Sequence, residues 1–537
     1  LIITGERATD GDTGQVGPGI AAWLGIPVLS HVSQLQLRDT SCLMATRLTE
    51  EGYQRLEVRL PCVLTVVKEI AVPRLPTLRG KQQARKVTIP CLTASDLGLD
   101  PETIGLAGSP TRVVKIFHPR VAREAERIEA REEAQIRQAI DRVLEVLDNQ
   151  GFLTPARNAC DDRPFESATQ QIQAEHALSS VDDNARLRPQ GKKEIWTLAE
   201  YRGGRLDTTS FELLARARPL ADQAGMLVTT VALSAAITDS DARMLIAHGA
   251  DCVIALESPC LADFECGTWS SALATLARDQ LPEIILAPAT TSGRALMPHL
   301  AIMLGTGLTA DCTDLALDPE TGDLLQTRPA IGGNIMATIR TPRHRPQMAT
   351  IRPHSTRPLQ PDTARQGCLI RKMLDPQLAD TRVKILGLDC ESHDFENLEA
   401  ARIVVAGGRG LRKADGFRHV RALADALGAA VGASREAVDR GWIGYPHQVG
   451  LSGKTISPDL YLCAGISGAI QHLAGIRTAK TIIAINSDPH APIHEVANLA
   501  IIGDLFEILP RLTKAVLQVR QSGRLEADAR NATRGHI

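Results

Sequence analysis

Aromatic side chains are scarce in this chain, since Phe, Tyr and Trp make up 3% of its 537 residues. Proteins that bind single-stranded nucleic acid stack the bases on such side chains. The formal net charge of −2 also lacks the positive excess that attracts phosphate backbones. The composition therefore predicts no nucleic-acid partner.

Membrane and metal-site signals are lacking as well. The chain has no run of about 18 apolar residues and no signal peptide, so we expect no membrane span. Its eleven cysteines include no C-x-x-C pair, the spacing typical of zinc and iron–sulfur sites. Scattered cysteines in odd number are typical of reduced thiols rather than of a disulfide framework. The sequence thus predicts a cytoplasmic protein without a metal.

Ordinary amounts of apolar and charged residues, 44% and 23%, allow the chain to bury normal cores. The length suggests about three domains. Apolar strand-like runs alternate with helical patterns, which predicts an α/β protein with several parallel-sheet, nucleotide-binding-like domains. The last of these domains has the pattern of a doubly wound sheet.

The stretch from Asp459 to Asp504 is the most informative part of the chain. Three short apolar runs in it are typical of buried parallel strands: Leu460–Ala464, Thr481–Ile485 and Leu499–Ile502. A polar turn follows each run, and helices are expected from about Ala469 and Leu505.

Polar residues in those turns are candidates for a binding site. Ligands of open α/β sheets bind outside the carboxyl ends of the strands. We therefore expect Ser467, Asn486 and Asp504 to lie close together on one rim, with Gln471 and His472 beside them. Ser, Asn and Asp are also the usual residues of caps and turns, and that simpler interpretation stays open for each.

Two earlier segments repeat the arrangement. The expected strand Arg402–Ala406 precedes Gly407-Gly408-Arg409-Gly410, and the expected strand Ala429–Gly432 precedes Ala433-Ser434-Arg435. A glycine-rich loop, Gln448–Lys454, lies between them and the core stretch. Exposed amides, cations and hydroxyls in these turns suit a pyrophosphate and a polar ring system.

Together, the motifs GGRGL, GASR, QVGLSGK, GISGAIQH, AIN and GDLF resemble, in order and spacing, the FAD domain of the electron transfer flavoprotein alpha subunit. By position, the resemblance implies sixteen FAD contacts: Arg409, Ser434, Arg435, Gln448, Val449, Gly450, Leu451, Ser452, Ser467, Gly468, Ala469, Ile470, Gln471, His472, Asn486 and Asp504.

The resemblance also implies roles for some of these residues. The arginine matching Arg435 lies over the isoalloxazine and favours its anionic reduced forms. The hydroxyl matching Ser452 bonds the flavin near N5, and the histidine matching His472 contacts the pyrimidine edge. Many family members have Thr at position 452 and Gln at position 451, where this chain has Ser452 and Leu451, so the resemblance does not imply a reduction potential.

Residues 1–118 form the first expected unit. A strand at Leu1–Thr4 leads into a glycine-rich loop and a helix over about Gly19–Leu24, which is the form of a phosphate site. A solvated loop is an equally simple interpretation. The candidate contacts with a second nucleotide are Asp10, Gly11, Asp12, Thr13, Gly14, Gln15 and Val16.

The pieces DGDTGQVGP, LTVVKEI and GLAGSPTRVVKIF resemble the C-terminal part of the electron transfer flavoprotein beta subunit. The loop is similar to that of electron-bifurcating relatives, which hold a second FAD and take electrons from NADH, whereas other relatives hold AMP there. The N-terminal half of a beta subunit has no counterpart, and Leu1–Ile3 already has the pattern of a core strand. We therefore expect upstream sequence to be missing, or supplied by a separate chain, and a second FAD or AMP to bind weakly.

Residues 119–190 change in character. The segment Arg120–Leu147 predicts an exposed helix with one apolar stripe. In the family, the corresponding segment is an arm that reaches onto the alpha subunit, and a solvated linker helix is the alternative. The polar stretch Gly151–Gln190 predicts a flexible tether.

Residues 191–375 predict a second α/β unit. Its expected strands are Glu194–Ala199, Val228–Leu233, Cys252–Leu256 and Glu283–Ala287, and the motifs APATTSGRALMP, LGTGLTADCTDL and GGNIMATI resemble the alpha subunit's N-terminal domain. A linker over 376–399, an FAD domain over 400–520 and a disordered polar tail over 521–537 complete the chain.

One repeat comes from the sequence itself. Residues 18–25 and 298–305 share the pattern P-x-[I/L]-A-x-x-L-G, and each copy follows an expected strand and a hydroxyl-bearing loop. This predicts that the two units share a fold around a pseudo-two-fold axis, unless two amphipathic helices are alike by chance.

The resemblance as a whole implies one chain that joins a beta-type segment to a complete alpha-type subunit. Bound FAD would do the redox chemistry, so the chain is an electron carrier that needs no nucleophile or general base. Electrons would come from an acyl-CoA or other dehydrogenase, or from NADH, and pass to another redox acceptor. A non-redox adenine-nucleotide-binding scaffold and an NAD-binding regulatory or hydrolase-like α/β protein are the alternatives.

Overall fold

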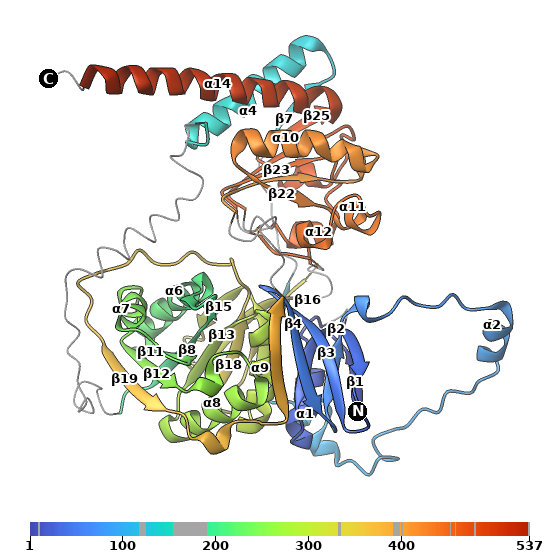
Figure 1. The fold of residues 1–537 in the computed structure, drawn as a ribbon, viewed down its shortest axis with the longest axis vertical. Coiled ribbons are helices and arrows are strands. Elements are labelled where there is room, and N and C mark those ends of the chain that lie inside the picture. The colour runs from blue at the N-terminus through green and yellow to red at the C-terminus, as the bar shows by residue number, and fades with distance from the viewer. Residues whose placement is uncertain are drawn as a thin grey trace. The chain divides into compact units, whose positions relative to one another are not determined.

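The computed structural model describes residues 1–8, 11–117, 125–153, 191–330, 335–389, 398, 401–451, 453–456, 458–476 and 479–534. Its contacts divide the chain into two compact units. The first unit contains the described residues up to 117 together with 191–330 and 336–389, and the second contains 125–153 and 398–534. Both units contain parallel strands and helices, and the first unit also contains antiparallel strands (Figure 1).

The first unit contains a six-stranded mixed sheet with the order β1-β5-β2-β3-β4-β20. The strands are β1 (Ile2–Gly5), β2 (Val28–Leu37), β3 (Cys42–Thr49), β4 (Gly52–Arg59), β5 (Val63–Val66) and β20 (Val383–Asp389). Buried leucines such as Leu29, Leu43 and Leu56 form its core. The expectation of a core strand at the start of the chain was wrong, because β1 lies at the sheet edge and Ile3 is 54% exposed.

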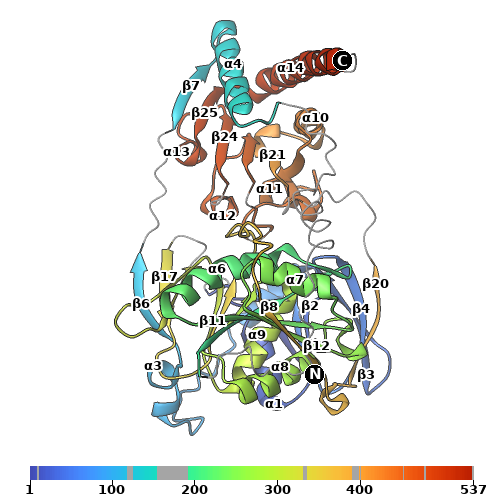
Figure 2. The ribbon, with the colours of Figure 1, turned by 90° about the vertical axis from the view of Figure 1, so that its left-hand side faces the viewer.

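A seven-stranded parallel sheet forms the rest of this unit, in the order β14-β18-β13-β8-β11-β12-β19. Its strands are β8 (Glu194–Ala199), β11 (Leu227–Ser234), β12 (Cys252–Glu257), β13 (Ile284–Pro288), β14 (Leu308–Cys312), β18 (Gln347–Ile351) and β19 (Cys368–Met373). Figure 2 shows α6 (Thr208–Ala224) and α7 (Asp239–Ala247) on one side of it, and α8 (Cys266–Gln280) and α9 (Thr291–Leu304) on the other. Coverage on both faces explains why its strands are nearly continuous apolar runs.

Smaller elements complete the first unit. An antiparallel sheet has the order β15-β16-β17-β6, with β15 (Asp314–Leu317), β16 (Leu324–Ala330), β17 (Ile335–Arg340) and β6 (Arg112–Phe117). The short strands β9 (Tyr201–Arg202) and β10 (Arg205–Leu206) pair with each other. The short helices α2 (Leu78–Ala84) and α3 (Gly105–Gly108) lie in a long excursion after β5 (Figure 1).

The repeated sequence pattern corresponds to a repeated local structure. Helix α1 (Val16–Leu24) joins β1 to β2 as α9 joins β13 to β14. In each copy a later strand lies between the two strands that the helix joins, giving the orders β1-β5-β2 and β13-β18-β14. His31 and Asp311 occupy matching places with left-handed φ values of 57° and 61°. Their backbone N–H groups donate to Thr65 Oγ1 at 3.1 Å and Thr350 Oγ1 at 2.8 Å. The two segments therefore share this local motif of three strands and a helix, whereas the sheets that contain it differ in their remaining strands.

The second unit is a six-stranded parallel sheet with the order β22-β21-β23-β24-β25-β7. Its strands are β7 (Glu126–Ala130), β21 (Ile403–Gly407), β22 (Ala430–Ala433), β23 (Leu460–Ala464), β24 (Thr481–Asn486) and β25 (Leu499–Gly503). The first five have the order of a doubly wound sheet. Shorter helices at its loops are α11 (Arg435–Asp439), α12 (Ile470–Ala474) and α13 (Ile493–Val496).

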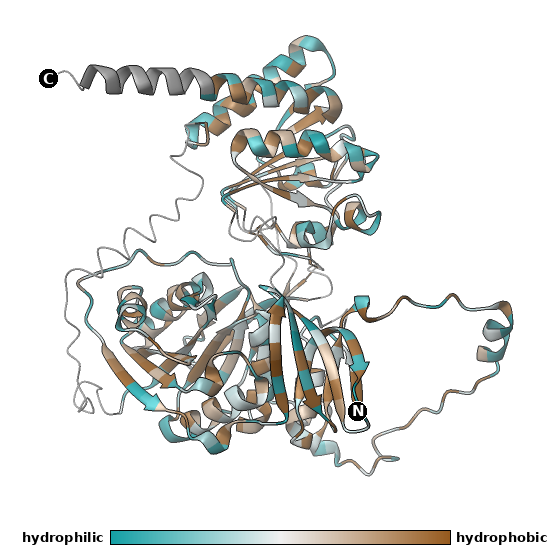
Figure 3. Cartoon of the chain, in the orientation of Figure 1, coloured by the Kyte–Doolittle hydropathy of each residue, from teal (hydrophilic) through white to brown (hydrophobic). Residues whose placement is uncertain are grey.

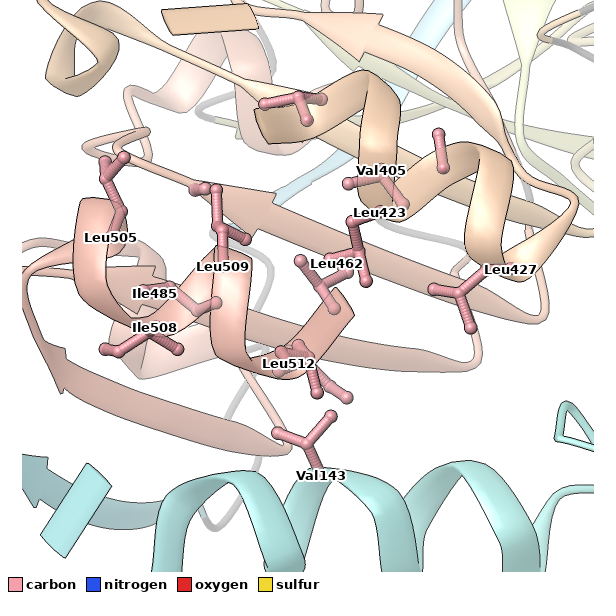
Figure 4. Packing of buried hydrophobic residues seen from close by; sticks show 14 of the residues in the cluster. Val143, Val405, Leu423, Leu427, Leu462, Ile485, Leu505, Ile508, Leu509 and Leu512 are labelled. Carbon is pink, nitrogen blue, oxygen red and sulfur yellow. The ribbon is translucent and has the colours of Figure 1, made fainter. Parts of the chain in front are cut away.

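Three helices bury one face of this sheet: α4 (Glu133–Asn149), α10 (Phe417–Leu427) and α14 (Leu505–Arg534). Figure 4 shows Val143 of α4 pointing toward Leu512 of α14, and both side chains are fully buried. The apolar stripe predicted in this segment thus packs in a core, so α4 is not a solvated linker helix.

Three expectations about local structure were wrong. The predicted helix over Arg120–Leu147 contains the strand β7, which pairs in parallel with β25 and buries Ile128 and Ala130. The predicted linker over 376–399 contains β20, which pairs with β4. Helix α14 continues to Arg534, through residues predicted to be a disordered tail.

One cysteine pair also departs from the expectation of reduced thiols. Cys252 and Cys368 are register partners on the adjacent strands β12 and β19 and form a disulfide. The tether predicted over Gly151–Gln190 lies largely outside the described residues. Among the described residues, no helix is long and apolar enough to cross a membrane, and no cluster of His, Cys, Asp or Glu could hold a metal ion.

Candidate functional site

The carboxyl ends of β21 and β23 carry glycines that bring two turns into direct contact. The Gly408 N–H donates to Ala464 O at 3.1 Å, and the Gly410 N–H donates to Gly465 O at 2.9 Å. A Cβ atom on Gly410 would lie 2.6 Å from Gly465 Cα, which is too close for any side chain. Glycine is therefore required here, and the rim is left as bare backbone beside Arg409.

The loop 448–454 is held against helix α12. The Leu451 N–H donates to Gln471 O at 2.7 Å, and the Val449 N–H donates to Ala433 O at 2.9 Å. Gly450 has φ 141°, and a Cβ there would lie 2.9 Å from Gln471 O. These bonds place the loop beside the end of β22 and against helix α12.

Charged and polar side chains at this rim face solvent. The side chains of Arg409 and Arg435 are 69% and 62% exposed, and they form surface ion pairs with Glu436 at 3.3 Å and Asp439 at 3.2 Å. Exposed pairs of this kind are weak, because water competes for both partners. Both guanidinium groups can therefore turn to an anionic ligand at small cost. Ser467, Ala469, Ile470 and Gln471 are exposed beside them, and Gly468 is buried.

Asn486 and Asp504 perform the cap and turn roles that the sequence left open. The Asn486 side chain donates to Ile466 O at 2.9 Å and accepts from the Asp488 N–H at 3.0 Å. The Asp504 carboxylate accepts from the Phe506 N–H at 2.8 Å at the start of α14, and it remains exposed. Ser434 is the N-cap residue of α11, but its hydroxyl makes no capping bond. Ser434 and Asp504 thus place polar side chains directly after the ends of β22 and β25.

Both ring nitrogens of His472 are engaged within the protein. Nδ1 lies 3.0 Å from Val449 O and Nε2 lies 2.7 Å from Tyr461 Oη. Because a carbonyl can only accept, Nδ1 carries the proton and Nε2 accepts from the tyrosine hydroxyl. Burial lowers the pKa of His472 to about 4, so the ring is neutral near pH 7. A bond from this ring to a flavin would have to displace one of these partners.

Tyr461 is the residue that sequence reasoning missed. Its side chain is fully buried in β23, and its hydroxyl anchors His472. A tyrosine inside an otherwise apolar strand is a signal for such a bond, because a buried hydroxyl needs a partner. Gln448 is buried in the same region, and Ser452 lies outside the described residues.

The candidate second-nucleotide loop lies in the first unit, and Asp10 is outside its described residues. Asp12 adopts φ 52°, and its carboxylate lies 3.3 Å from Arg7 Nε. The Gly11 carbonyl accepts from Arg328 Nη2 at 2.5 Å, and Gln15 Nε2 donates to Leu308 O at 3.3 Å. The Asp12 carboxylate therefore pairs with a cation of the protein. The bonds with Arg328 and Leu308 attach the loop to the α/β segment 191–330. Thr13, Gly14 and Val16 complete it at the start of α1.

Comparison with known proteins identifies the family. The family model for the electron transfer flavoprotein domain matches residues 1–97 and 195–374, and the model for the electron transfer flavoprotein FAD-binding domain matches residues 397–477. The chain belongs to the electron transfer flavoprotein family. The FAD-binding match covers the turns after β21, β22 and β23 described above.

Curated relatives agree with this assignment. The electron transfer flavoprotein subunit alpha of Thermoanaerobacterium thermosaccharolyticum is 46% identical over 61% of this chain and 99% of its own length. Protein FixB of Clostridium saccharobutylicum is 42% identical over 60% of this chain and 95% of its own length. Protein FixB of Rhizobium meliloti is 39% identical over 63% and 96% of the two chains.

The rim of the second unit fits the FAD that this electron transfer flavoprotein family binds. The exposed Arg409 and Arg435 supply positive charge for a phosphate, beside the glycine turns after β21 and β23. Ser467, Gln471 and Asp504 supply exposed polar groups for hydroxyls and ring edges. The chemistry of these groups matches a dinucleotide better than a metal or an apolar ligand.

Proposed function

We propose that this electron transfer flavoprotein holds its FAD at the carboxyl rim of the sheet β22-β21-β23-β24-β25. The sixteen positions predicted from the sequence supply the contacts, by side chain or by backbone. The observation that carries the proposal is the direct packing of Gly408 and Gly410 on Gly465, beside two exposed arginines. This packing brings the turns after β21 and β23 together at the rim, next to two cations that can pair with phosphate.

The residues of the chain hold and tune the cofactor, whereas the bound flavin supplies the ability to accept and release electrons. Arg435 provides positive charge that favours a ring carrying added negative charge. Asp504 offers a carboxylate to hydroxyl groups. His472 holds the loop around Val449 through its ring and needs no proton exchange. No side chain acts as nucleophile or general base.

The electron donor is proposed to be an acyl-CoA or other dehydrogenase, or NADH, and the acceptor another redox protein. The excursion around α2 offers a surface for such partners, since Val72, Leu75 and Leu78 are 91%, 92% and 77% exposed. Neighbouring exposed apolar side chains of this kind are typical of interaction sites. A cytoplasmic location remains part of the proposal. Of the described cysteines, seven are free thiols, and Cys252 and Cys368 form the disulfide.

The single chain is proposed to combine a beta-type segment with an alpha-type subunit and to bind one FAD firmly. A second FAD or AMP at the loop 11–16 is expected to bind weakly, and electron bifurcation would require the second site to hold FAD. The ion pair of Asp12 with Arg7 and the bond from Arg328 to the Gly11 carbonyl support weak binding. Loop groups that are bonded within the protein are less available to a nucleotide.

Denaturing the purified chain and counting the released FAD and AMP tests the proposal. We expect one FAD per chain, flavin absorbance in the native protein, and a second nucleotide only at high added concentration. Two tightly held nucleotides would contradict the weak second site, and a colourless protein that binds AMP or NAD would favour a non-redox scaffold.

A further inference from the structure

The turn after β21 and the start of helix α10 carry a group of exposed cations. They are Arg412, Lys413, Arg418 and Arg421, and we call them the basic patch. The side chains of Lys413 and Arg418 are 76% and 66% exposed. The formal net charge of the whole chain is −2, so positive charge is concentrated at this place. A local excess of this kind attracts acidic partners.

Packed elements hold these cations in place. In Figure 4, Leu423 of α10 lies in the core, where its side chain is fully buried. Arg418 and Arg421 are exposed on the same helix, three residues apart, so their side chains are neighbours. The Arg412 guanidinium lies 5.2 Å from the centre of the Phe506 ring, which attaches the turn to the start of α14. The basic patch is therefore presented by a helix and an anchored turn.

Carboxylates of the protein neutralise only part of this charge. Asp415 lies 3.1 Å from Arg418 and 3.9 Å from Lys413, so one carboxylate serves two cations. Arg412 and Arg421 form no ion pair with any residue that the structure describes. Water competes for the partners of exposed ion pairs, so those pairs are weak. The patch thus keeps an excess of positive charge that is available to a partner.

The basic patch borders the rim at which FAD is proposed to bind. Arg412 follows Gly410, whose N–H donates to Gly465 O at 2.9 Å between the ends of β21 and β23. Phe506, which lies under the Arg412 guanidinium, donates through its N–H to the candidate FAD contact Asp504 at 2.8 Å. A redox protein that docks on the patch would therefore lie next to the rim that holds the flavin.

The surface around the patch favours a protein partner over a membrane. Within residues 401–444, all of which the structure describes, no large apolar side chain is exposed. Helices that bind a membrane surface insert apolar side chains into it. Short-lived complexes between redox proteins have small interfaces, and opposite charges guide their encounter. A charged surface without apolar anchors therefore suits a transient complex with a protein.

We propose that the basic patch docks a small electron-transfer protein with an acidic surface, and that this protein accepts electrons from the FAD. The inference rests on the proposed function, because it needs FAD at the neighbouring rim. Two one-electron acceptors oxidise one fully reduced FAD, each taking one electron at its metal centre, and the protons of the flavin pass to solvent. Opposite charges raise the rate of encounter and orient the partner toward the rim.

Stopped-flow oxidation of the full chain, with its FAD reduced by stoichiometric dithionite, tests the docking surface. The acceptors are the acidic copper protein plastocyanin of plants and the basic haem protein cytochrome c. We expect the rate constant for plastocyanin, but not for cytochrome c, to fall at least about tenfold between about 10 mM and about 1 M ionic strength. An evenly spread charge of −2 would repel plastocyanin and predicts a rise with salt. A plastocyanin rate that stays constant or rises would overturn the proposal.

Lys413→Glu and Arg402→Glu form a matched pair of variants. Both side chains are well exposed, at 76% and 74%, and both substitutions change the charge equally. Arg402 precedes β21, at the opposite, amino end of the sheet, and Lys480 still pairs with Asp459 when it is replaced. At about 10 mM ionic strength, Lys413→Glu and Arg421→Glu should each slow plastocyanin reduction at least about threefold, and Arg402→Glu should leave it nearly unchanged. Equal effects at positions 413 and 402 would overturn the assignment to the patch.

A neutral acceptor separates this proposal from the proposed function. Benzoquinone carries no charge, so it should oxidise the reduced FAD of the wild type and of every variant at the same rate, and the FAD content shows that each variant is folded. A chain without FAD would contradict the proposed function, whereas normal benzoquinone rates with salt-independent plastocyanin rates would overturn the docking surface alone. Binding to phosphatidylserine vesicles that Lys413→Glu abolishes, with unchanged plastocyanin rates, would overturn it in favour of a membrane.

Discussion

Acidification should destabilise the FAD-binding unit through His472, whose ring is locked as a neutral group. It is 6% exposed and held between Tyr461 Oη at 2.7 Å and Val449 O at 3.0 Å. Its pKa falls from 6.5 to about 4 on folding because the site is buried. As the pH drops below 6.5, the unfolded chain takes up a proton at this position and the folded chain does not. The stability is thus complete above about pH 6.5 and is lost as the pH falls toward 4.

The size of the effect follows from the two pKa values. Each pKa unit corresponds to about 1.4 kcal/mol, so the full loss is about 3 kcal/mol. Between pH 7 and pH 5, His472 alone should remove about 2 kcal/mol from the free energy of unfolding. Other buried histidines add to the total, and His494 in the same unit also has a lowered pKa through burial.

A variant isolates the contribution of His472. Urea unfolding at pH 7 and pH 5, followed by the fluorescence of released flavin, measures the pH dependence in the wild type and in His472→Gln. The variant will be less stable at both pH values because it loses two bonds, but its stability should fall by about 2 kcal/mol less between them. The same fall in both proteins would refute the assignment of a neutral, buried ring.

Three further predictions concern the same unit. Arg435→Ala should lower the flavin reduction potential, by roughly 20 mV for a surface charge worth about 1 kcal/mol, while Arg440→Ala, at the C-cap of the same helix, should not. A redox titration with full FAD content that shows no change removes Arg435 from this role. Asp504→Ala should weaken FAD retention in dialysis by about 1–3 kcal/mol, and Asp504→Asn, which keeps the bond from the Phe506 N–H, separates this loss from the loss of the helix cap. Leu147→Ala, at a fully buried site in α4, should lower the unfolding free energy of the unit by about 2–5 kcal/mol in urea; a stability unchanged from that of the wild type would mean that α4 is not part of the core.

The parts of the fold that the sequence predicts best are strands buried on both faces. The run Leu460–Ala464 was predicted with the bounds that β23 has, since five successive apolar residues between turns leave little choice. The rim at the carboxyl ends of these strands followed from the parallel arrangement. The structure adds the contacts of Gly410 with Gly465, which no single motif reveals.

The parts that the sequence did not predict depend on distant partners. Glu126–Ala130 has alternating charges inside an Arg/Glu-rich segment, which favours a helix until β25 is present to pair with it. The role of His472 in helix α12 could not be read from its motif, because Tyr461 lies outside that motif on β23, 11 residues earlier, and its hydroxyl binds Nε2. The local sequence pattern thus predicts most helices and strands. Contacts between separate elements decide which strands form the sheet edges and which groups the side chains bond.

Strand β7 has a consequence for the order in which the chain can fold. It closes the edge of the second unit's sheet beside β25, yet it precedes every other strand of that sheet in the chain. During synthesis β7 and α4 leave the ribosome before the other elements of this unit. The side chains of Ile128 and Val143, which are buried in the folded unit, stay exposed until β25 and α14 have been made. A ribosome that stalls before residue 499 would therefore release an apolar helix and an unpaired strand, the features that chaperones bind and that promote aggregation.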